Sequence, residues 1–172
     1  MLKAAGGGLI LLASVGLAVT LGAELREHIS LLYEIRQMLL DIAQEAGYCL
    51  LPMEEILENR LHPRNEILSR FCKALGSTLR EKGGCDGTIL WQQEMERYQK
   101  KLQLDAAERE VLEHAGRAFF GKNTEENESN LALCLERLDY IIEEKRGEQK
   151  EKKRVAQTVS IMGGLMLIIL LI

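Results

Sequence analysis

The side chains that could bind a metal ion are sparse in this chain and are not spaced to work together. The three histidines, His28, His62 and His114, lie far apart in the sequence. A metal site typically combines closely spaced His, Cys or acidic ligands in a recognisable pattern. We therefore predict that each histidine is a surface or packing residue and that the protein holds no metal.

The acidic residues also lack the pattern of general acid–base catalysis. Pairs such as Glu54–Glu55, Glu125–Glu126 and Glu143–Glu144 are neighbours, and neighbouring residues of a helix point to different faces. The sequence contains no phosphate-binding Gly-Lys-Ser or Gly-Lys-Thr and no Gly-x-Ser-x-Gly elbow. We predict that the protein is not an enzyme and needs no cofactor. An enzyme acting on lipid or cell wall is the alternative.

The four cysteines, Cys49, Cys72, Cys85 and Cys134, show no short paired spacing of the zinc or redox type. Scattered cysteines of this kind are typical of free thiols in a reducing compartment. Two disulfides are the alternative if the domain faces the outside.

Two uncharged apolar runs enclose nearly all of the charge. Residues 4–23 and 155–172 carry no ionisable side chain, and Lys3 is the only charged residue outside Glu24 to Arg154. As helices these runs would be about 30 Å and 27 Å long, enough to cross a hydrocarbon core. We predict a transmembrane helix over 4–23, a helical domain over 24–154 and a transmembrane helix over 155–172. A cleaved signal peptide is the alternative for the first run, but its length favours a retained anchor.

Basic residues flank the two runs on the domain side. Lys3 is the only basic side chain on the far side. Those on the domain side are Arg26, Arg36, Lys145, Arg146, Lys150, Lys152, Lys153 and Arg154. This bias predicts a two-pass protein of the cell membrane with a cytoplasmic domain. The domain is acidic overall and the chain has few aromatics, which argues against nucleic acid and favours contact with anionic lipid.

Between the runs, apolar residues repeat at three- and four-residue steps, and helix-forming residue types dominate the composition. The fold class is therefore all-α, a bundle of about six helices flanked by an N-terminal and a C-terminal transmembrane helix. Gly47 is expected to end the first helix, Pro52 and Pro63 to open the next two, and Asp86 and Asp105 to cap those that follow. The first helix is expected to end at residue 46. The expected ranges of the others are 53–61, 64–82, 87–102, 106–120 and 124–172.

Several short pieces of the chain stand in a distinctive order and spacing. These pieces are Met1-Leu2-Lys3 before a Gly-rich span, Glu45-Ala46-Gly47-Tyr48 followed by Pro52-Met53, Phe120-Gly121, Gly163-Gly164-Leu165 and residues 167–172. In their order, their spacing and the total length, the whole chain resembles the stage III sporulation protein AB family of endospore-forming bacteria. The chain departs from the family pattern at Thr124, where an acidic residue is expected, and at Glu128, where Gln is expected.

The resemblance implies a structural platform subunit of the secretion-like sporulation complex that links mother cell and forespore. It implies a bundle similar to the cytoplasmic domain of the type II secretion platform protein, in the mother-cell membrane facing the forespore. The implied partners are the other proteins of the same operon, including a secretion-type ATPase, and a homo-oligomer is left open. The alternative is an unrelated membrane-tethered helical adaptor or sensor that docks a cytoplasmic partner.

The residues expected to bind a partner are Glu45, Tyr48 and Pro52, around the first helical corner. Capping and packing at the helix end are an equally good interpretation of the same three residues. We predict that Tyr48→Ala impairs assembly of the complex but leaves membrane insertion intact, because a corner contact is lost while both apolar runs remain. Co-purification of the complex and membrane fractionation of the variant would measure the two effects. Normal assembly and normal sporulation of the variant would contradict the prediction.

Overall fold

The computed structural model describes residues 2–49, 51–121 and 123–171. For residues 2–22, 48–49, 124, 160–161 and 164–171 it describes the backbone alone. The described chain is all-α, with six α-helices, one π-helix and no strand. The elements are α1 (Leu2–Cys49), α2 (Met53–Glu55), the π-helix η1 (Ile56–Arg60), α3 (Glu66–Glu81), α4 (Gly87–Tyr98), α5 (Ala106–Phe120) and α6 (Thr124–Leu171). The all-α part of the predicted fold class is therefore confirmed.

The described residues contain no helix with an apolar stretch long enough to cross a membrane. The predicted spans 4–23 and 155–172 lie largely outside the residues whose side chains are described. The two predicted spans fall within α1 and α6, each of which is one continuous helix of 48 residues.

The chain divides into two compact units. One consists of Met1–Ser30 with Glu143–Ile172, and the other of Leu31–Ile142. In the first unit the described side chains are mostly exposed, and ion pairs such as Arg146–Glu143 and Lys152–Glu148 run along α6. The second unit contains most of the buried side chains and is referred to below as the bundle.

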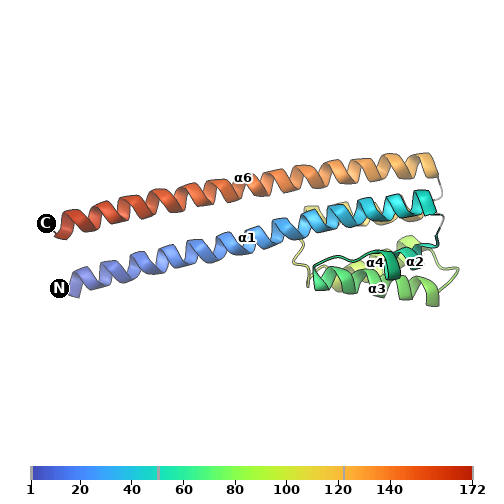
Figure 1. Cartoon of the computed structure of the whole chain (residues 1–172), viewed down its shortest axis with the longest axis horizontal. Helices are drawn as coiled ribbons and strands as arrows, with labels where there is room; N and C mark the ends of the chain where they lie inside the picture. The colour runs from blue at the N-terminus through green and yellow to red at the C-terminus, as the bar shows by residue number, and fades with distance from the viewer. Residues whose placement is uncertain (1, 50, 122, 172) are drawn as a thin grey trace. The chain divides into compact units, whose positions relative to one another are not determined.

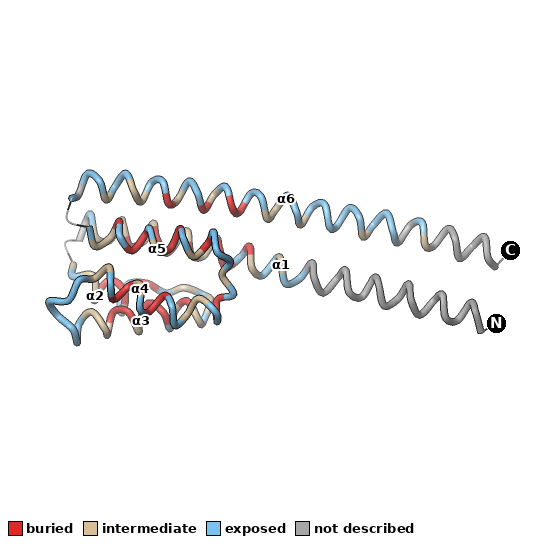
Figure 2. Tube along the Cα trace, turned by 180° about the vertical axis from the view of Figure 1, so that it is seen from behind, coloured by how far each residue is buried: buried red, intermediate tan, exposed pale blue. Residues whose placement is uncertain are grey.

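The bundle is arranged in three layers (Figure 1). The first part of α6 forms one outer layer, α1 and α5 lie in the middle, and α2, η1, α3 and α4 form the other outer layer. Buried residues lie on the facing sides of these helices (Figure 2). On α1 the fully buried stripe is Leu32, Ile35, Leu39 and Ile42, at the steps of three and four that the sequence predicts.

Local capping signals place the helix starts. Asp86 accepts a hydrogen bond from the Thr88 N–H at 2.9 Å, and Asp105 and Glu108 form a reciprocal capping box. These two caps are confirmed, and each contributes about 1 kcal/mol. The helix after Pro63 begins later than predicted because the Asn65 side chain accepts from the N–H groups of both Ile67 and Leu68. This cap determines the start of α3, so the prediction of Pro63 in its first turn is wrong.

Other helix ends also differ from the sequence-based boundaries. The first helix passes Gly47 and ends at Cys49. The segment 53–61 is only partly α-helical, because the Leu61 N–H donates to the Ile56 carbonyl at 3.2 Å and widens the turn to a π-helix. The wider turn lets Ile56, Leu57 and Leu61 all be buried. The fourth helix ends at Tyr98 rather than near residue 102.

Trp91 occupies the contact between α4 and α5. Its side chain is 1% exposed, and its indole N–H donates to the Leu112 carbonyl at 2.8 Å. A Cβ on Gly116 would lie 2.3 Å from the Trp91 ring, so α5 approaches α4 closely only because residue 116 has no side chain. Phe71 of α3 packs edge-on against the same indole, with 5.4 Å between ring centroids.

We predict that Gly116→Ala lowers the free energy of unfolding by about 1–3 kcal/mol, because the new methyl group overlaps the Trp91 ring. The matched control is Gly147→Ala, also in a helix, where an added Cβ meets no atom within 4 Å. That control is expected to raise stability by about 0.5–1 kcal/mol through reduced backbone entropy of the unfolded chain. Urea unfolding of the full chain in detergent, followed by far-UV circular dichroism, measures both. Equal effects of the two substitutions would contradict the close packing at Gly116.

Candidate functional site

The first candidate surface is the corner between α1 and α2. Glu45 is half-buried near the end of α1, and its Oε2 lies 3.9 Å from the Nε of Arg60 in η1. Pro52 is exposed, and its carbonyl accepts from the N–H groups of Glu55 and Ile56 at 3.0 and 3.2 Å. The side chain of Tyr48 lies outside the described residues. The structure thus gives Glu45 and Pro52 contacts within the fold, and their role in binding a partner stays a prediction.

A second feature joins the two long helices inside the bundle. The Arg36 guanidinium of α1 donates to both carboxylate oxygens of Asp139 on α6, at 2.6 and 2.9 Å. This hydrogen bond to Asp139 raises the pKa of Arg36, and burial opposes the shift. Both side chains are partly exposed, at 32% and 47%, so the pair contributes at most about 1 kcal/mol. Its bidentate geometry fixes the register of α1 against α6.

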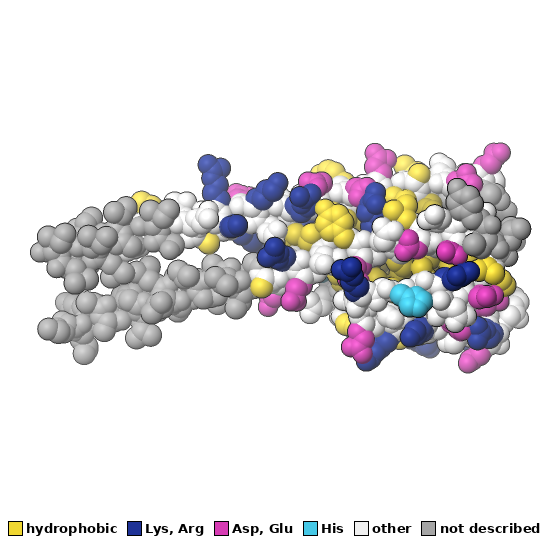
Figure 3. All heavy atoms as spheres, viewed as in Figure 1, with side chains coloured by type: hydrophobic (Ala, Val, Ile, Leu, Met, Phe, Trp, Pro, Cys, Tyr) yellow, Lys and Arg dark blue, Asp and Glu magenta, His cyan; other side chains and the backbone are white. Residues whose placement is uncertain are grey.

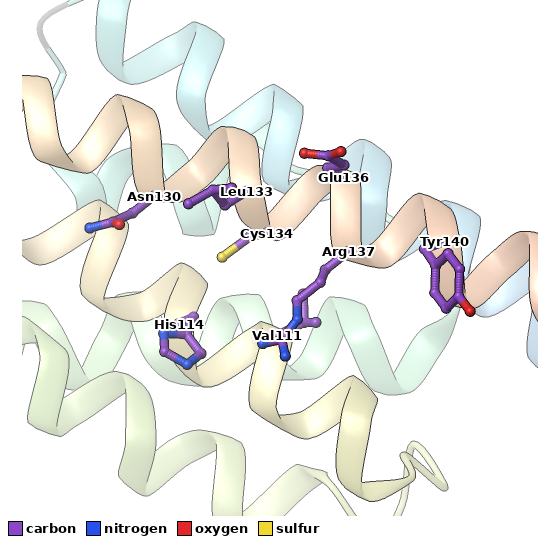
Figure 4. Close-up of a pocket in the computed structure, with 8 residues that line it drawn as sticks. All are labelled: Val111, His114, Asn130, Leu133, Cys134, Glu136, Arg137 and Tyr140. Atoms are coloured by element: carbon purple, nitrogen blue, oxygen red, sulfur yellow. The ribbon is translucent and has the colours of Figure 1, made fainter.

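The third candidate is a groove between α5 and α6 with a volume of about 510 Å³ (Figure 4). Val111 of α5 and Cys134 of α6 are both buried and line it, whereas Leu133 and Tyr140 on α6 are 58% and 71% exposed. Figure 4 shows Cys134 projecting from α6 toward α5. The groove is therefore an apolar surface that is open to solvent on one side.

Charged and polar side chains surround this groove. Arg137 bridges the two helices through an ion pair with Glu110 of α5 at 3.1 Å. His114 and Asn130 continue it into a second hollow of about 330 Å³ with polar walls, which also includes Arg117 and Glu126. Sequence reasoning did not identify this surface. The sequence feature that could have indicated it is the large number of apolar residues after residue 130, more than one buried helix face can accommodate. The buried face of α6 consists of Cys134, Leu138, Ile141 and Ile142, and Leu133 lies outside it.

Two of the three cysteines whose side chains are described, Cys72 and Cys134, are buried in the packing of the bundle, whereas Cys85 is exposed. The Cys72 thiol is buried 3.4 Å from the Met38 sulfur, and burial raises its pKa to about 12. Burial also raises the pKa of Cys134, so both thiols are protonated and weakly nucleophilic at neutral pH. Cys72, Cys85 and Cys134 are free, whereas the side chain of Cys49 lies outside the described residues.

Two carboxylates are buried, and both have structural partners. Glu94 on α4 accepts from Arg97 at 2.7 Å and from the Thr78 hydroxyl at 3.3 Å. Glu108 belongs to the capping box at the start of α5. Within the described part of the chain, no three His, Cys, Asp or Glu residues are grouped so as to hold a metal ion.

The fold and its surfaces define a small all-α protein with an open apolar groove and ion-paired helices. The chain belongs to the stage III sporulation protein AB family, whose family model matches residues 3–172. The chain is also similar to a solved structure described as stage III sporulation protein AB. The TM-score is 0.63 at 19% identity, covering 70% of this chain and 94% of that chain, and at this identity the likeness shows the fold. A comparison with curated proteins finds no match.

We predict that Arg36→Ala and Asp139→Asn each lower the free energy of unfolding by about 0.5–1 kcal/mol, because each removes the bidentate pair between α1 and α6. The charge-swapped double variant Arg36→Asp with Asp139→Arg should recover part of this loss. The control pair is Arg70 and Glu66, an exposed ion pair within α3, whose loss should cost about 0.3–0.5 kcal/mol at most. Urea unfolding at low and high salt measures the coupling. If the effects of Arg36→Ala and Asp139→Asn add up fully in the double variant that carries both, the pair contributes nothing to stability.

Proposed function

We propose that this protein is a membrane-anchored platform subunit of the secretion-like sporulation complex that links mother cell and forespore. In this proposal it acts through protein–protein contacts and catalyses no reaction. The observation that carries the proposal is the family match, because it covers the bundle and both terminal apolar runs instead of the bundle alone.

The proposed membrane anchors are the runs 4–23 and 155–172. Their support is the absence of ionisable side chains over about the length that a bilayer requires. Basic side chains gather along the described part of α6 before the second run (Figure 3), where they would face a negatively charged cytoplasmic leaflet. We therefore place the bundle in the mother-cell cytoplasm, on the membrane that faces the forespore.

The proposed partners are the proteins of the same operon, including a secretion-type ATPase. Support comes from the family and from the kind of surface that the bundle offers. Helical bundles with ion-paired, capped helices present rigid faces, and rigid faces favour binding because little conformational entropy is lost on association. The apolar groove between α5 and α6 is a surface that a partner could cover.

Affinity purification tests this proposal. The full-length tagged protein would be purified in mild detergent from sporulating cells and its companions identified by mass spectrometry. An untagged strain gives the background, and a tagged unrelated two-pass membrane protein controls for co-solubilised lipid and membrane proteins. We expect enrichment of the secretion-type ATPase and of the other membrane proteins of the operon.

The outcome also separates the two functional hypotheses. Recovery of signalling proteins in place of the ATPase would favour the adaptor or sensor function. A clean preparation from cells in which the complex is intact would contradict the platform proposal.

A further inference from the structure

We propose that one end of the bundle docks on the anionic headgroups of the membrane through Arg64, Lys100 and Lys101. It is the end at which α1 enters the bundle at Leu31 and α6 leaves it at Ile142 (Figure 1). The inference rests on the proposed membrane anchors and adds a lipid-binding surface that lies outside the basic stretch of α6. Three observations carry it: the short connecting helices, the cations without an ion pair at this end, and the kind of side chains that surround them.

Short helical connectors join this end of the bundle to the proposed anchors. Residues 24–30 of α1 and 143–154 of α6 form these connectors, and their helical rise gives lengths of about 11 Å and 18 Å. The headgroup layer adds about 5–8 Å to each side of the hydrocarbon core. With the first run in the membrane, the entry point of α1 therefore lies within one Debye length, about 8 Å, of the headgroups. Charges at this end of the bundle are attracted or repelled by the lipid surface.

Two connections place the three cations at this end of the bundle (Figure 1). Arg64 precedes Asn65, the N-cap of α3, whose backbone N–H donates to the Glu34 carboxylate of α1 at 2.7 Å. Glu34 lies about one helical turn beyond the point where α1 enters the bundle. Lys100 and Lys101 follow α4, which returns toward the start of α3 after a short turn. The three cations are therefore neighbours at one end of the bundle although they are far apart in the sequence.

These cations are exposed and form no ion pair within the described chain. The nearest acidic residues in the sequence are engaged elsewhere, Glu66 with Arg70 and Asp105 in the capping box of α5. Residues 97–104 carry three basic and no acidic side chains. The connection from α4 to α5 is therefore a positive surface in a chain whose net charge is −4.

The connection that carries the two lysines has a well-defined conformation. Leu102 is 2% exposed, and its N–H donates to the Tyr98 carbonyl at 2.9 Å. Gln103 has a φ of 55°, a left-handed conformation that a residue with a side chain keeps only where the surrounding structure holds it. Lys100 and Lys101 are therefore presented on a structured loop, so little backbone entropy is lost when they meet the headgroups.

The side chains at this end favour lipid over a protein partner. Among the described residues of the bundle, the exposed large apolar side chains are Tyr33, Ile89, Leu133 and Tyr140, and none of them lies in the connections 61–65 and 99–105. A protein interface usually has an apolar centre. Binding to an anionic headgroup layer requires only charge, and each Lys or Arg near such a surface strengthens it about five-fold.

Lysine footprinting of the full-length protein in lipid nanodiscs tests the inference. The protein would be placed in nanodiscs of neutral phosphatidylcholine or of an equal mixture with anionic phosphatidylglycerol. Brief acetylation by an N-hydroxysuccinimide ester, followed by mass spectrometry, gives the reaction rate of each lysine. Lys82 is the matched control, because it is also exposed without an ion pair in the described chain but follows the other end of α3, about 24 Å along that helix.

We expect Lys100 and Lys101 to react about five-fold more slowly in the anionic than in the neutral nanodiscs, with no change at Lys82. Salt at about 1 M should remove this protection, because the Debye length falls to about 3 Å. Arg64→Gln should lower the protection to about two-fold, because one of the three cations is lost. Arg117→Gln, at an exposed position in the last turn of α5, should leave it unchanged.

Equal rates at Lys100 and Lys101 in the two lipids would overturn the inference, as would equal protection of Lys82 or protection that persists at about 1 M salt. Co-elution of the protein with the nanodiscs tests the anchors independently. If the protein enters the nanodiscs but the two lysines are not protected, the anchors stand and the docking surface is wrong. If the protein does not enter them, the proposed anchors are wrong and the inference falls with them.

Discussion

The bundle depends on the close contact between Trp91 and Gly116. Trp91 is the single tryptophan of the chain, and it contacts two other helices: α3 through Phe71, and α5 through Gly116 and Phe119. A side chain at residue 116 would overlap the indole, and one at residue 87 of α4 would overlap the Phe120 ring of α5, so the close approach of α4 and α5 depends on two residues without a Cβ. Each aromatic side chain packed at this point can bury about 150–250 Å², so the cluster of Trp91 and its aromatic neighbours supplies a large part of the buried apolar area of a bundle this small.

The position of α5 determines which of its residues are available to contact α6. The residues of α5 that face α4 include Leu112, Ala115 and Gly116, so α6 packs beside Val111 and His114 instead. Among the α6 residues whose side chains are described, Cys134, Leu138, Ile141 and Ile142 are buried, whereas Leu131 and Leu135 are half-buried. The open groove follows from this narrow contact. Two ion pairs within one turn of α6, Arg36–Asp139 and Arg137–Glu110, join this helix to α1 and α5.

Local features of the sequence predict the helices well and their ends less well. The caps at Asp86 and Asp105 are confirmed because a cap involves residues two or three positions apart. The π-helix at Ile56 was not predictable from periodicity, since it depends on Leu57 and Glu58 packing against Gly76 of α3. The Arg36–Asp139 pair joins residues 103 positions apart, and no pattern within one helix indicates such a partner. Contacts between residues far apart in the sequence determine where the groove opens, and these contacts could not be predicted from the sequence.

The two candidate interaction surfaces differ in how far their residues already make contacts within the fold. The Pro52 carbonyl accepts two backbone hydrogen bonds at the start of α2, so the fold accounts for Pro52. The buried Glu45 Oε2 lies 3.9 Å from the Arg60 Nε and has no hydrogen bond among the described residues. Leu133 and Tyr140 have large apolar side chains that remain mostly exposed, at a cost in hydration that packing within the bundle does not offset. An exposed apolar pair beside an open groove is stabilised when another protein covers it. For that reason the groove, which no motif indicated, is the stronger candidate for the contact between this bundle and a partner.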